Sequence, residues 1–168
     1  FIQPRIEAEI AFVMKAPLKG ADITRADVLA ATDYVAPSLE ILDTRVQRAD
    51  PVTGKARTIF DTISDNAANA GVVLGAERHA PDSVDLRWTG AILKRDGVVE
   101  ETGLGAGVLD DPATGILWLV HRLADYGAGL SAGDIVLSGS FIRPVEAPPG
   151  SRFHADFGRF GSVSLSFA

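Results

Sequence analysis

The stretch "RIEAEIAF", residues 5–12, has an apolar residue at every second position. A period of two predicts a β-strand with one apolar face. Side chains two residues apart in a strand point the same way, so Glu7 and Glu9 project together from the other face. These two like charges either face solvent or share a divalent cation, and a cation would need at least one further acidic ligand.

A third acidic residue, Glu40, lies in an apolar segment between Leu39 and Ile41. Carboxylates in such surroundings are seldom simply solvated. Carboxylate oxygens are the ligands that hard cations such as Mg²⁺ take, and Mn²⁺ suits the same oxygens. Glu7, Glu9 and Glu40 are therefore a candidate metal site, although their spacing alone leaves a solvated strand face as an open alternative.

Composition indicates one domain, spanning residues 1–168, with enough hydrophobic residues (46%) to bury a core. The net charge is −6 and no Lys/Arg cluster stands out, so we expect no nucleic-acid partner. The absence of cysteine excludes disulfides and thiolate metal sites and fits a cytoplasmic protein. No apolar run approaches the roughly 18 residues of a membrane span, and no signal-peptide pattern is present.

The patterns along the chain predict strands more often than helices. Helices are expected over residues 25–33 and after the capping residue Asp111. The dipeptide Asp96-Gly97 between apolar runs predicts a β-hairpin, and a further strand is expected in "VAPSLEILDTRV", residues 35–46. About eight strands and two clear helices indicate an α+β, β-rich chain, folded as a mixed β-roll or barrel with peripheral helices.

Two polar stretches are candidate ligand contacts. In "SDNAANAG", Ser64, Asp65 and Asn66 could hold a water molecule or a substrate, although an Asx-turn or a helix cap is the leading alternative. In "LSGS", Ser138 and Ser140 could bind a ligand, and the alternative is that their hydroxyl groups stabilise a turn.

The glycine-rich stretch "GLGAG", residues 103–107, lacks the spacing of a dinucleotide-binding loop, and no βαβ pattern surrounds it. We expect these glycines to allow close approach of backbone segments instead. The three histidines are scattered without metal-ligand spacing, so a structural role is expected for each.

The segments "PRIEAEIAFV", "FDTISDNAANAGVVLG" and "LSGSFIRPV" resemble the hydratases of the fumarylacetoacetate hydrolase superfamily, most narrowly the 2-oxo-hept-4-ene-1,7-dioate hydratases. The resemblance runs in order along the whole chain. It implies the C-terminal β-roll of that superfamily, a homo-oligomer that could be large, and Mg²⁺ bound by Glu7, Glu9 and Glu40.

The implied activity is metal-dependent addition of water to a 2-hydroxy-2,4-dienoate diacid, in the catabolism of aromatic compounds such as homoprotocatechuate. Decarboxylation of a vinylogous 2-keto diacid and a non-catalytic, truncated subunit are the alternatives. The substrate would be a small keto-diacid, and Asp65, Asn66 and Ser64 are the candidates for catalysis. Arg143, in "GSFIRPV", is expected to bind the distal carboxylate, with Arg87 and Arg45 as competitors.

Members of this group carry an additional N-terminal region with a lysine that the resemblance implicates in proton transfer. No residue of this chain matches that lysine, and Lys15 is in the wrong place. Because the chain starts at Phe1, we expect that a preceding portion is missing. The isolated 168 residues are then expected to bind metal but to be catalytically impaired.

Overall fold

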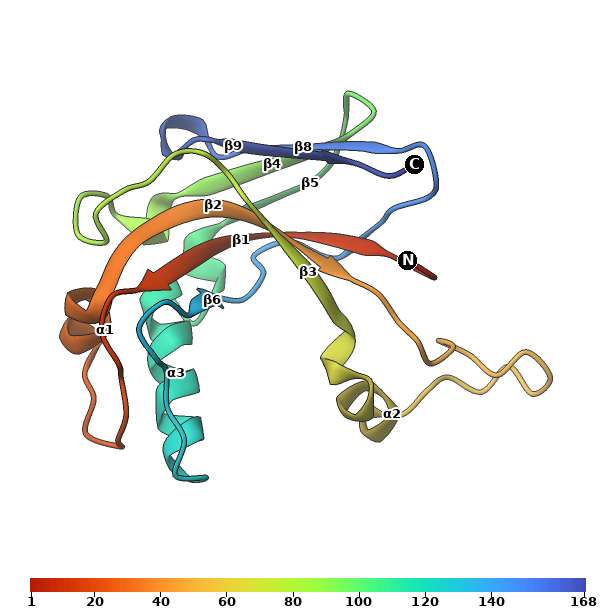
Figure 1. The fold of residues 1–168 in the computed structure, drawn as a ribbon. Coiled ribbons are helices and arrows are strands. Elements are labelled where there is room, and N and C mark those ends of the chain that lie inside the picture. Colours follow the sequence, from red (N-terminus) through yellow and green to blue (C-terminus); the bar gives the residue numbers. More distant parts are fainter.

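A computed structural model describes all 168 residues and shows two stacked antiparallel β-sheets with helices below them (Figure 1). The first sheet has the order β3-β2-β1-β6, and β7 also pairs with β1. Its strands are β1 (Arg5–Met14), β2 (Thr32–Leu42), β3 (Asn69–Leu74), β6 (Ile135–Leu137) and β7 (Val145–Glu146). The second sheet has the order β5-β4-β8-β9. Its strands are β4 (Gly90–Arg95), β5 (Val98–Leu104), β8 (Arg152–Asp156) and β9 (Ser162–Ser166).

Three α-helices and four short 3₁₀-helices complete the chain, so the predicted β-rich α+β class is confirmed. Two of the α-helices had been expected from the sequence. The α-helices are α1 (Arg25–Ala31), α2 (Ile59–Ser64) and α3 (Pro112–Ala124). The 3₁₀-helices are η1 (Asn66–Ala68), η2 (Leu86–Trp88), η3 (Gly105–Gly107) and η4 (Gly158–Phe160).

The hydrophobic core lies between the two sheets and is built on the apolar face of β1. Ile6, Ala8 and Ile10 are fully buried there, in one cluster with Leu93 of β4 and Phe153 of β8. Burying a large apolar side chain stabilises a fold by about 1.5–3 kcal/mol. A shift of β1 by one residue would expose this whole face, so the core fixes which residues lie on the opposite face.

The long helix α3 begins as the sequence predicts. The Asp111 side chain accepts a hydrogen bond from the Ala113 backbone N–H (2.8 Å), and Pro112 occupies the first turn. Ile116 and Val120 are fully buried and pack into the core cluster. None of the three α-helices has the length and hydrophobicity of a membrane span.

The predicted hairpin is confirmed, with positive φ angles at Asp96 (52°) and Gly97 (86°) between β4 and β5. These are the left-handed conformations that a two-residue hairpin turn of type I′ requires. The strand expected over residues 35–46 is confirmed as β2, which starts three residues earlier, at Thr32, and ends at Leu42. Its residues 35–39 are buried on both faces, which removes the alternation that marks a strand in sequence.

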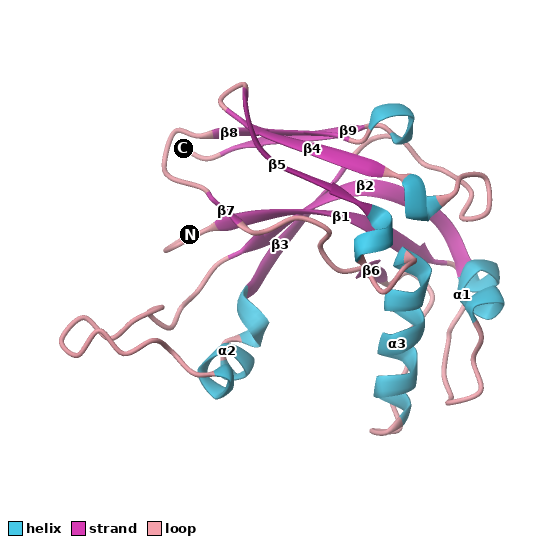
Figure 2. Cartoon of the chain, turned by 180° about the vertical axis from the view of Figure 1, so that it is seen from behind, coloured by secondary structure: helices cyan, strands magenta, loops and turns pink.

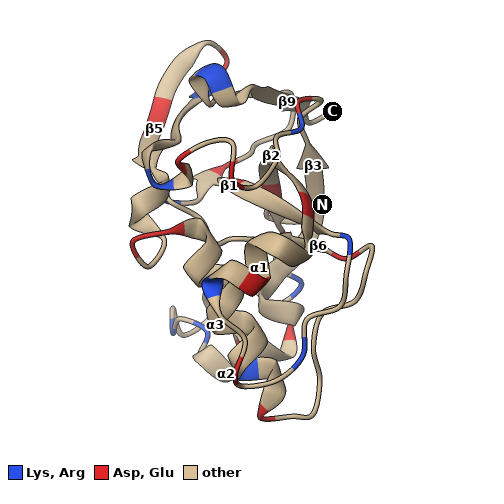
Figure 3. Ribbon diagram, turned by 90° about the vertical axis from the view of Figure 1, so that its left-hand side faces the viewer, with Lys and Arg blue, Asp and Glu red and all other residues tan.

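Helix α2 was not predicted. Thr58 caps it, and Asp61 completes a capping box with the backbone of Thr58. Its apolar residues do not pack into the core, and Phe60 is 76% exposed, so no buried stripe revealed the helix in the sequence. Together with the preceding arm, residues 43–58, α2 projects from one end of the first sheet (Figures 1 and 2). In the view of Figure 3, acidic and basic residues are interspersed along the ribbon.

Candidate metal centre

The pairing of β1 with β2 brings the three candidate ligands together. Glu7 lies opposite Glu40, and Glu9 lies opposite Ser38, two residue pairs further along. Residues opposite each other in an antiparallel pair point to the same face. One carboxylate oxygen from each of Glu7, Glu9 and Glu40 lies within 4.8 Å of the others. The cluster therefore sits on the sheet face opposite the core.

Two of the three carboxylates are held by uncharged donors. The Glu9 side chain is buried, with 2% of the residue exposed, and its Oε2 accepts a hydrogen bond from the Gly139 backbone N–H (2.8 Å). Glu40 Oε1 accepts a hydrogen bond from Asn69 Nδ2 (2.8 Å). None of the eight salt bridges of the chain involves the cluster. Three acidic groups therefore converge without a cationic side chain as a partner.

This crowding perturbs the titration of the cluster. Burial, reinforced by the negative charge of Glu40, raises the pKa of Glu7 to about 7. Burial also raises the pKa of Glu9 to about 8, against the lowering effect of the Gly139 hydrogen bond, and the charges of Glu40 and Glu7 raise it further. Each free carboxylate destabilises its neighbours, so a bound cation would relieve the repulsion.

The arrangement fits a small divalent cation. Oxygens around an octahedral Mg²⁺ lie about 2.1 Å from the ion, so two of them are at most about 4.2 Å apart. Carboxylates within 4.8 Å of one another reach that separation by small side-chain movements. All three donors are hard oxygen ligands, which suit Mg²⁺, Mn²⁺ or Ca²⁺ better than softer metals.

Asn69 is a neighbour of the cluster that the sequence analysis did not assign. It follows three consecutive residues in the left-handed region, Asn66 (φ 53°), Ala67 (φ 52°) and Ala68 (φ 67°). This unusual turn reverses the chain after α2 and starts β3 beside β2, which places the Asn69 side chain against Glu40. The left-handed run of two alanines is not readable from sequence, since alanine seldom adopts that conformation.

Asp65 holds the same turn in place. Its carboxylate forms an ion pair with the Arg45 guanidinium and accepts hydrogen bonds from the backbone N–H groups of Arg45 (2.8 Å) and Val46 (3.2 Å). The Arg45 hydrogen bond holds the pKa of Asp65 below its ordinary value. Asp65 thus joins the arm to the turn, whereas Ser64, at the end of α2, and Asn66, on the turn, are exposed.

The predicted ligand serines form hydrogen bonds with backbone groups. The Ser138 hydroxyl group is buried, donates to the Gly139 carbonyl (3.2 Å) and accepts from the Ile10 N–H (3.4 Å). The Ser140 hydroxyl group donates to the Ile142 carbonyl (2.9 Å). These contacts match the turn-stabilising alternative and hold Gly139 against Glu9.

Arg143 lies on the surface, with 86% of its side chain exposed. Its Nε donates a hydrogen bond to Glu101 Oε1 of β5 (2.9 Å), and its Nη2 lies 2.7 Å from the same oxygen. Its predicted competitors are also paired, Arg87 with Asp110 and Arg45 with Asp65. The structure does not bring Arg143 into contact with the carboxylate cluster.

No family model matches the sequence. The chain is 55% identical over 167 residues to the 2-oxo-hept-4-ene-1,7-dioate hydratase of Escherichia coli, covering 99% of this chain and 62% of that protein. It superimposes on 4-oxalocrotonate decarboxylase from Pseudomonas putida G7, complexed with magnesium and adipate, with a TM-score of 0.89 and 34% identity. That match covers 100% of this chain and 62% of the decarboxylase.

A more distant match, fumarylacetoacetate hydrolase from Exiguobacterium antarcticum, has a TM-score of 0.70 at 18% identity, covering 98% of this chain and 56% of that one. The fold is therefore that of the fumarylacetoacetate hydrolase superfamily. Over the residues it spans, the chain is similar in sequence and structure to hydratases and decarboxylases that act on dienoate and keto-diacid compounds by name. It spans about three fifths of the length of the curated relatives it matches.

Proposed function

We propose that this chain is the metal-binding part of a hydratase that adds water to a 2-hydroxy-2,4-dienoate diacid, of the kind named by 2-oxo-hept-4-ene-1,7-dioate. The observation that carries the proposal is the convergence of Glu7, Glu9 and Glu40 in a chain 55% identical to such a hydratase. Aromatic catabolism, including homoprotocatechuate degradation, is the proposed context.

The three glutamates would hold one Mg²⁺, and Mn²⁺ would suit the same oxygens. When bound, such a cation supplies Lewis-acid polarisation of a substrate oxygen and a template for orientation. The other residues of the site would position the metal ligands and contact the substrate. Gly139 fixes Glu9 through its N–H group. Ser64, at the end of α2, and Asn66, in the turn that follows, are exposed and are proposed to contact the substrate or the attacking water.

Decarboxylation of a related keto-diacid is the second candidate. It is favoured by the structural similarity to 4-oxalocrotonate decarboxylase at 34% identity. Both reactions can use the same metal-binding carboxylates, so the products must separate them.

The test uses the full-length protein, stripped of metal with a chelator and supplied with the seven-carbon dienoate diacid. We expect loss of dienoate absorbance only after Mg²⁺ or Mn²⁺ is added, and a hydrated 4-hydroxy-2-oxo diacid as the product by mass spectrometry. Release of CO₂ with loss of one carbon would identify the decarboxylase instead. Turnover that persists unchanged in excess chelator would refute both candidates.

We also propose a homo-oligomer in the cytoplasm. Helix α2 supports an assembly, because it exposes Ile59, Phe60 and Ile63 together on a six-residue helix. Exposed apolar clusters of this kind often mark interaction surfaces. Light scattering of the full-length protein measures the state directly, and a monomer at all concentrations would contradict the proposal.

Metal binding should strengthen with pH. Protons compete with the cation for Glu7 and Glu9, whose pKa values are raised to about 7 and about 8. Mg²⁺ affinity should therefore rise between about pH 6 and pH 8.5 and then level off. In the metal-free protein the sign is opposite. A raised carboxyl pKa stabilises the fold fully below the unfolded-state value of about 4.5, and this contribution is lost as the pH rises through 7 to 8.

Calorimetric titration with Mg²⁺ and thermal unfolding in chelator, both as a function of pH, measure these two trends. Mg²⁺ should raise the unfolding temperature more at about pH 8.5 than at about pH 6. An affinity that does not change over this range would contradict protonation of the cluster.

Asn69→Ala should weaken Mg²⁺ binding by about 10- to 100-fold, the range found when a partner that orients a metal ligand is removed. The reason is that Asn69 Nδ2 is the donor that orients Glu40. Thr62→Ala is the matched control, because its hydroxyl group bonds only to the Thr58 carbonyl within α2 (3.2 Å). Equal Mg²⁺ affinities of the two variants, measured by calorimetry, would show that Asn69 does not support the site.

A further inference from the structure

A second feature lies beside the cluster, on the same face of the first sheet. Arg5 precedes Glu7 by two residues on β1, so both side chains point to the face opposite the core. In the sheet, Arg5 pairs with Leu42 on one side and with Glu146 on the other. On this face of the sheet, Arg5 is therefore the next residue along β1 from Glu7, about 7 Å away along the strand.

The start of β1, the end of β2 and the adjoining arm form one corner of the sheet. The buried side-chain polar atoms that lack a hydrogen-bond partner all belong to these segments. They are Arg5 Nε, Thr44 Oγ1 and Arg57 Nη1. Thr44 follows the end of β2, where its carbonyl oxygen accepts a hydrogen bond from Gln3 Nε2 (3.4 Å). Buried polar groups are satisfied in the great majority of cases, so three exceptions in one corner indicate that a polar ligand or water belongs there.

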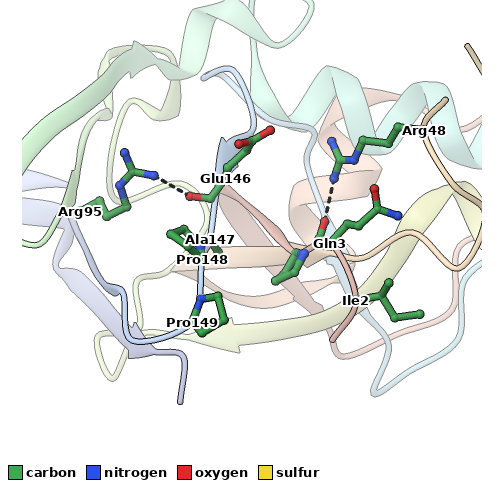
Figure 4. A pocket seen from close by; sticks show the side chains of 9 residues that line it. Ile2, Gln3, Arg48, Arg95, Glu146, Ala147, Pro148 and Pro149 are labelled. Atoms are coloured by element: carbon green, nitrogen blue, oxygen red, sulfur yellow. Dashed lines mark hydrogen bonds between the residues drawn. The ribbon is translucent and has the colours of Figure 1, made fainter. Parts of the chain in front are cut away.

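The corner also holds an arginine, Arg48, whose charge is not paired with a carboxylate. Arg48 has no carboxylate oxygen within 4.0 Å, and its Nη2 donates to the Gln3 backbone carbonyl (2.7 Å; Figure 4). Burial lowers the pKa of Arg48, and the positive charges of Arg5 and Arg57 lower it further. Arg57 lies beside Arg48, because its backbone N–H donates to the Arg48 carbonyl (2.9 Å), and its Nη1 lies 3.9 Å from Asp65 Oδ2.

The acidic residues nearby are largely committed elsewhere. Asp43 accepts the backbone N–H groups of Ile2 (2.8 Å) and Gln3 (2.7 Å). Asp65 pairs with Arg45, as described above. Glu146 pairs with Arg5 Nη2 at 2.9 Å, but its own side chain is 73% exposed. An exposed ion pair of this kind contributes little, so a ligand carboxylate can replace it at small cost.

There is open space at this corner. A cavity of about 340 Å³ is lined by Arg48 and Arg95 from opposite sides, with Glu146 and Gln3 between them (Figure 4). The Arg95 guanidinium donates to the Glu146 backbone carbonyl (3.0 Å), which holds the start of the segment that follows β7. Arg5 adjoins this cavity through its neighbour Pro4 and its ion-pair partner Glu146, which both line it. Arg95 is itself paired with Glu100.

The length of the proposed substrate matches this distance. An extended seven-carbon chain of carbon–carbon bonds near 1.5 Å places its two terminal carbons roughly 8 Å apart. A diacid with one end at Glu7, Glu9 and Glu40 would place its other carboxylate at the next row along β1, where Arg5 lies. Arginine suits this role because its planar guanidinium can form two parallel hydrogen bonds with a carboxylate.

We propose that Arg5, supported by Arg48, binds the distal carboxylate of a diacid substrate and exchanges Glu146 for it. This inference rests on the proposed function for the reacting end of the substrate. It differs from the sequence-based assignment to Arg143, which lies outside β1 and does not contact the carboxylate cluster. A substrate with a single carboxylate would have no group to pair with Arg5, so Arg5 would not contribute to its affinity.

The test compares two unreactive ligands, 2-oxoheptanedioate and 2-oxoheptanoate, which differ only in the distal carboxylate. Their binding to the full-length protein with Mg²⁺ is measured by calorimetry, together with Mg²⁺ affinity. Arg5→Ala should weaken the diacid by about 10²-fold, the scale of losing a charged hydrogen-bonded pair, while the monoacid and Mg²⁺ change little. Arg48→Ala should cause a smaller loss in the same direction.

Two further variants keep the inference falsifiable. Arg143→Ala is the matched control and should leave diacid binding unchanged. Glu146→Gln removes the competitor for Arg5 and should strengthen diacid binding several-fold, a gain that damage to the fold would not produce. A diacid-specific loss in Arg143→Ala would assign the role to Arg143. Equal losses of both ligands in Arg5→Ala, or no loss of either, would mean that the corner holds only water or supports the fold.

Binding and turnover separate this inference from the proposed function. If the diacid binds in an Arg5-dependent way but is not hydrated, the hydratase proposal fails and the carboxylate site stands. If hydration proceeds and Arg5→Ala does not discriminate between the two ligands, the carboxylate site fails alone.

Discussion

Glu9→Gln is expected to weaken Mg²⁺ binding by more than about 10²-fold, because removing a direct ligand should exceed the 10- to 100-fold cost of losing an outer partner. Glu9 is the most buried member of the cluster and is positioned by the Gly139 N–H. Glutamine keeps the size of the side chain and an oxygen for that hydrogen bond, but it has no negative charge. Calorimetric titration with Mg²⁺ measures the loss directly.

The same substitution should not harm the metal-free fold. A neutral amide removes one of three mutually repelling groups, so the unfolding temperature in chelator should stay level or rise. The rise that Mg²⁺ causes in the parent protein should disappear. Glu146→Gln is a matched control, since Glu146 lies on the same sheet but outside the cluster, and its Mg²⁺-dependent rise should remain. A normal Mg²⁺ response in Glu9→Gln would show that the glutamates do not share a cation.

Gly103→Ala is expected to destabilise the fold by about 1–3 kcal/mol or more, the cost of forcing atoms into a packed site. A Cβ at Gly103 would lie 1.9 Å from the Phe141 backbone oxygen, so two backbone segments would have to separate. The glycine-rich stretch was predicted to allow such close approach, and this is confirmed. Gly107→Ala is the control from the same stretch, because its Cβ would meet the Phe141 side chain at an ordinary 3.5 Å.

Urea unfolding of both variants measures the difference. Because Phe141 lies two residues after Gly139, a shift of this segment should also disturb the N–H that holds Glu9. Mg²⁺ binding should therefore weaken in Gly103→Ala and stay normal in Gly107→Ala. Equal stability of the two variants would mean that the segment around Phe141 moves aside without cost.

Much of the fold follows from local sequence. The period of two in β1 determines that Glu7 and Glu9 share a face, because that periodicity is a property of any extended chain. The caps of α1 and α3 and the turn at Asp96-Gly97 are also readable, since each depends on residues within a few positions. Helix α2 was missed because its apolar residues remain outside the core, so they form no buried stripe.

The site was only partly predictable, because its contacts join residues that are distant in the chain. Glu40 could be singled out as an acid in an apolar segment, but its place opposite Glu7 depends on the register between β1 and β2. The contact of Asn69 with Glu40 depends on a left-handed turn of non-glycine residues. The ion pair of Arg143 with Glu101 of β5 joins residues 42 positions apart in the chain.

The sequence by itself determined the local periods, the helix caps, the hairpin and the identity of the acidic residues, because each rests on interactions between near neighbours. Only the tertiary structure decided which of these residues meet. The register of β1 with β2 and β7, held by burial of Ile6 and its apolar neighbours against the second sheet, places Glu40 against the paired glutamates and Arg5 one row away. Contacts between residues distant in the chain arise from packing of the whole core, and no local pattern encodes them.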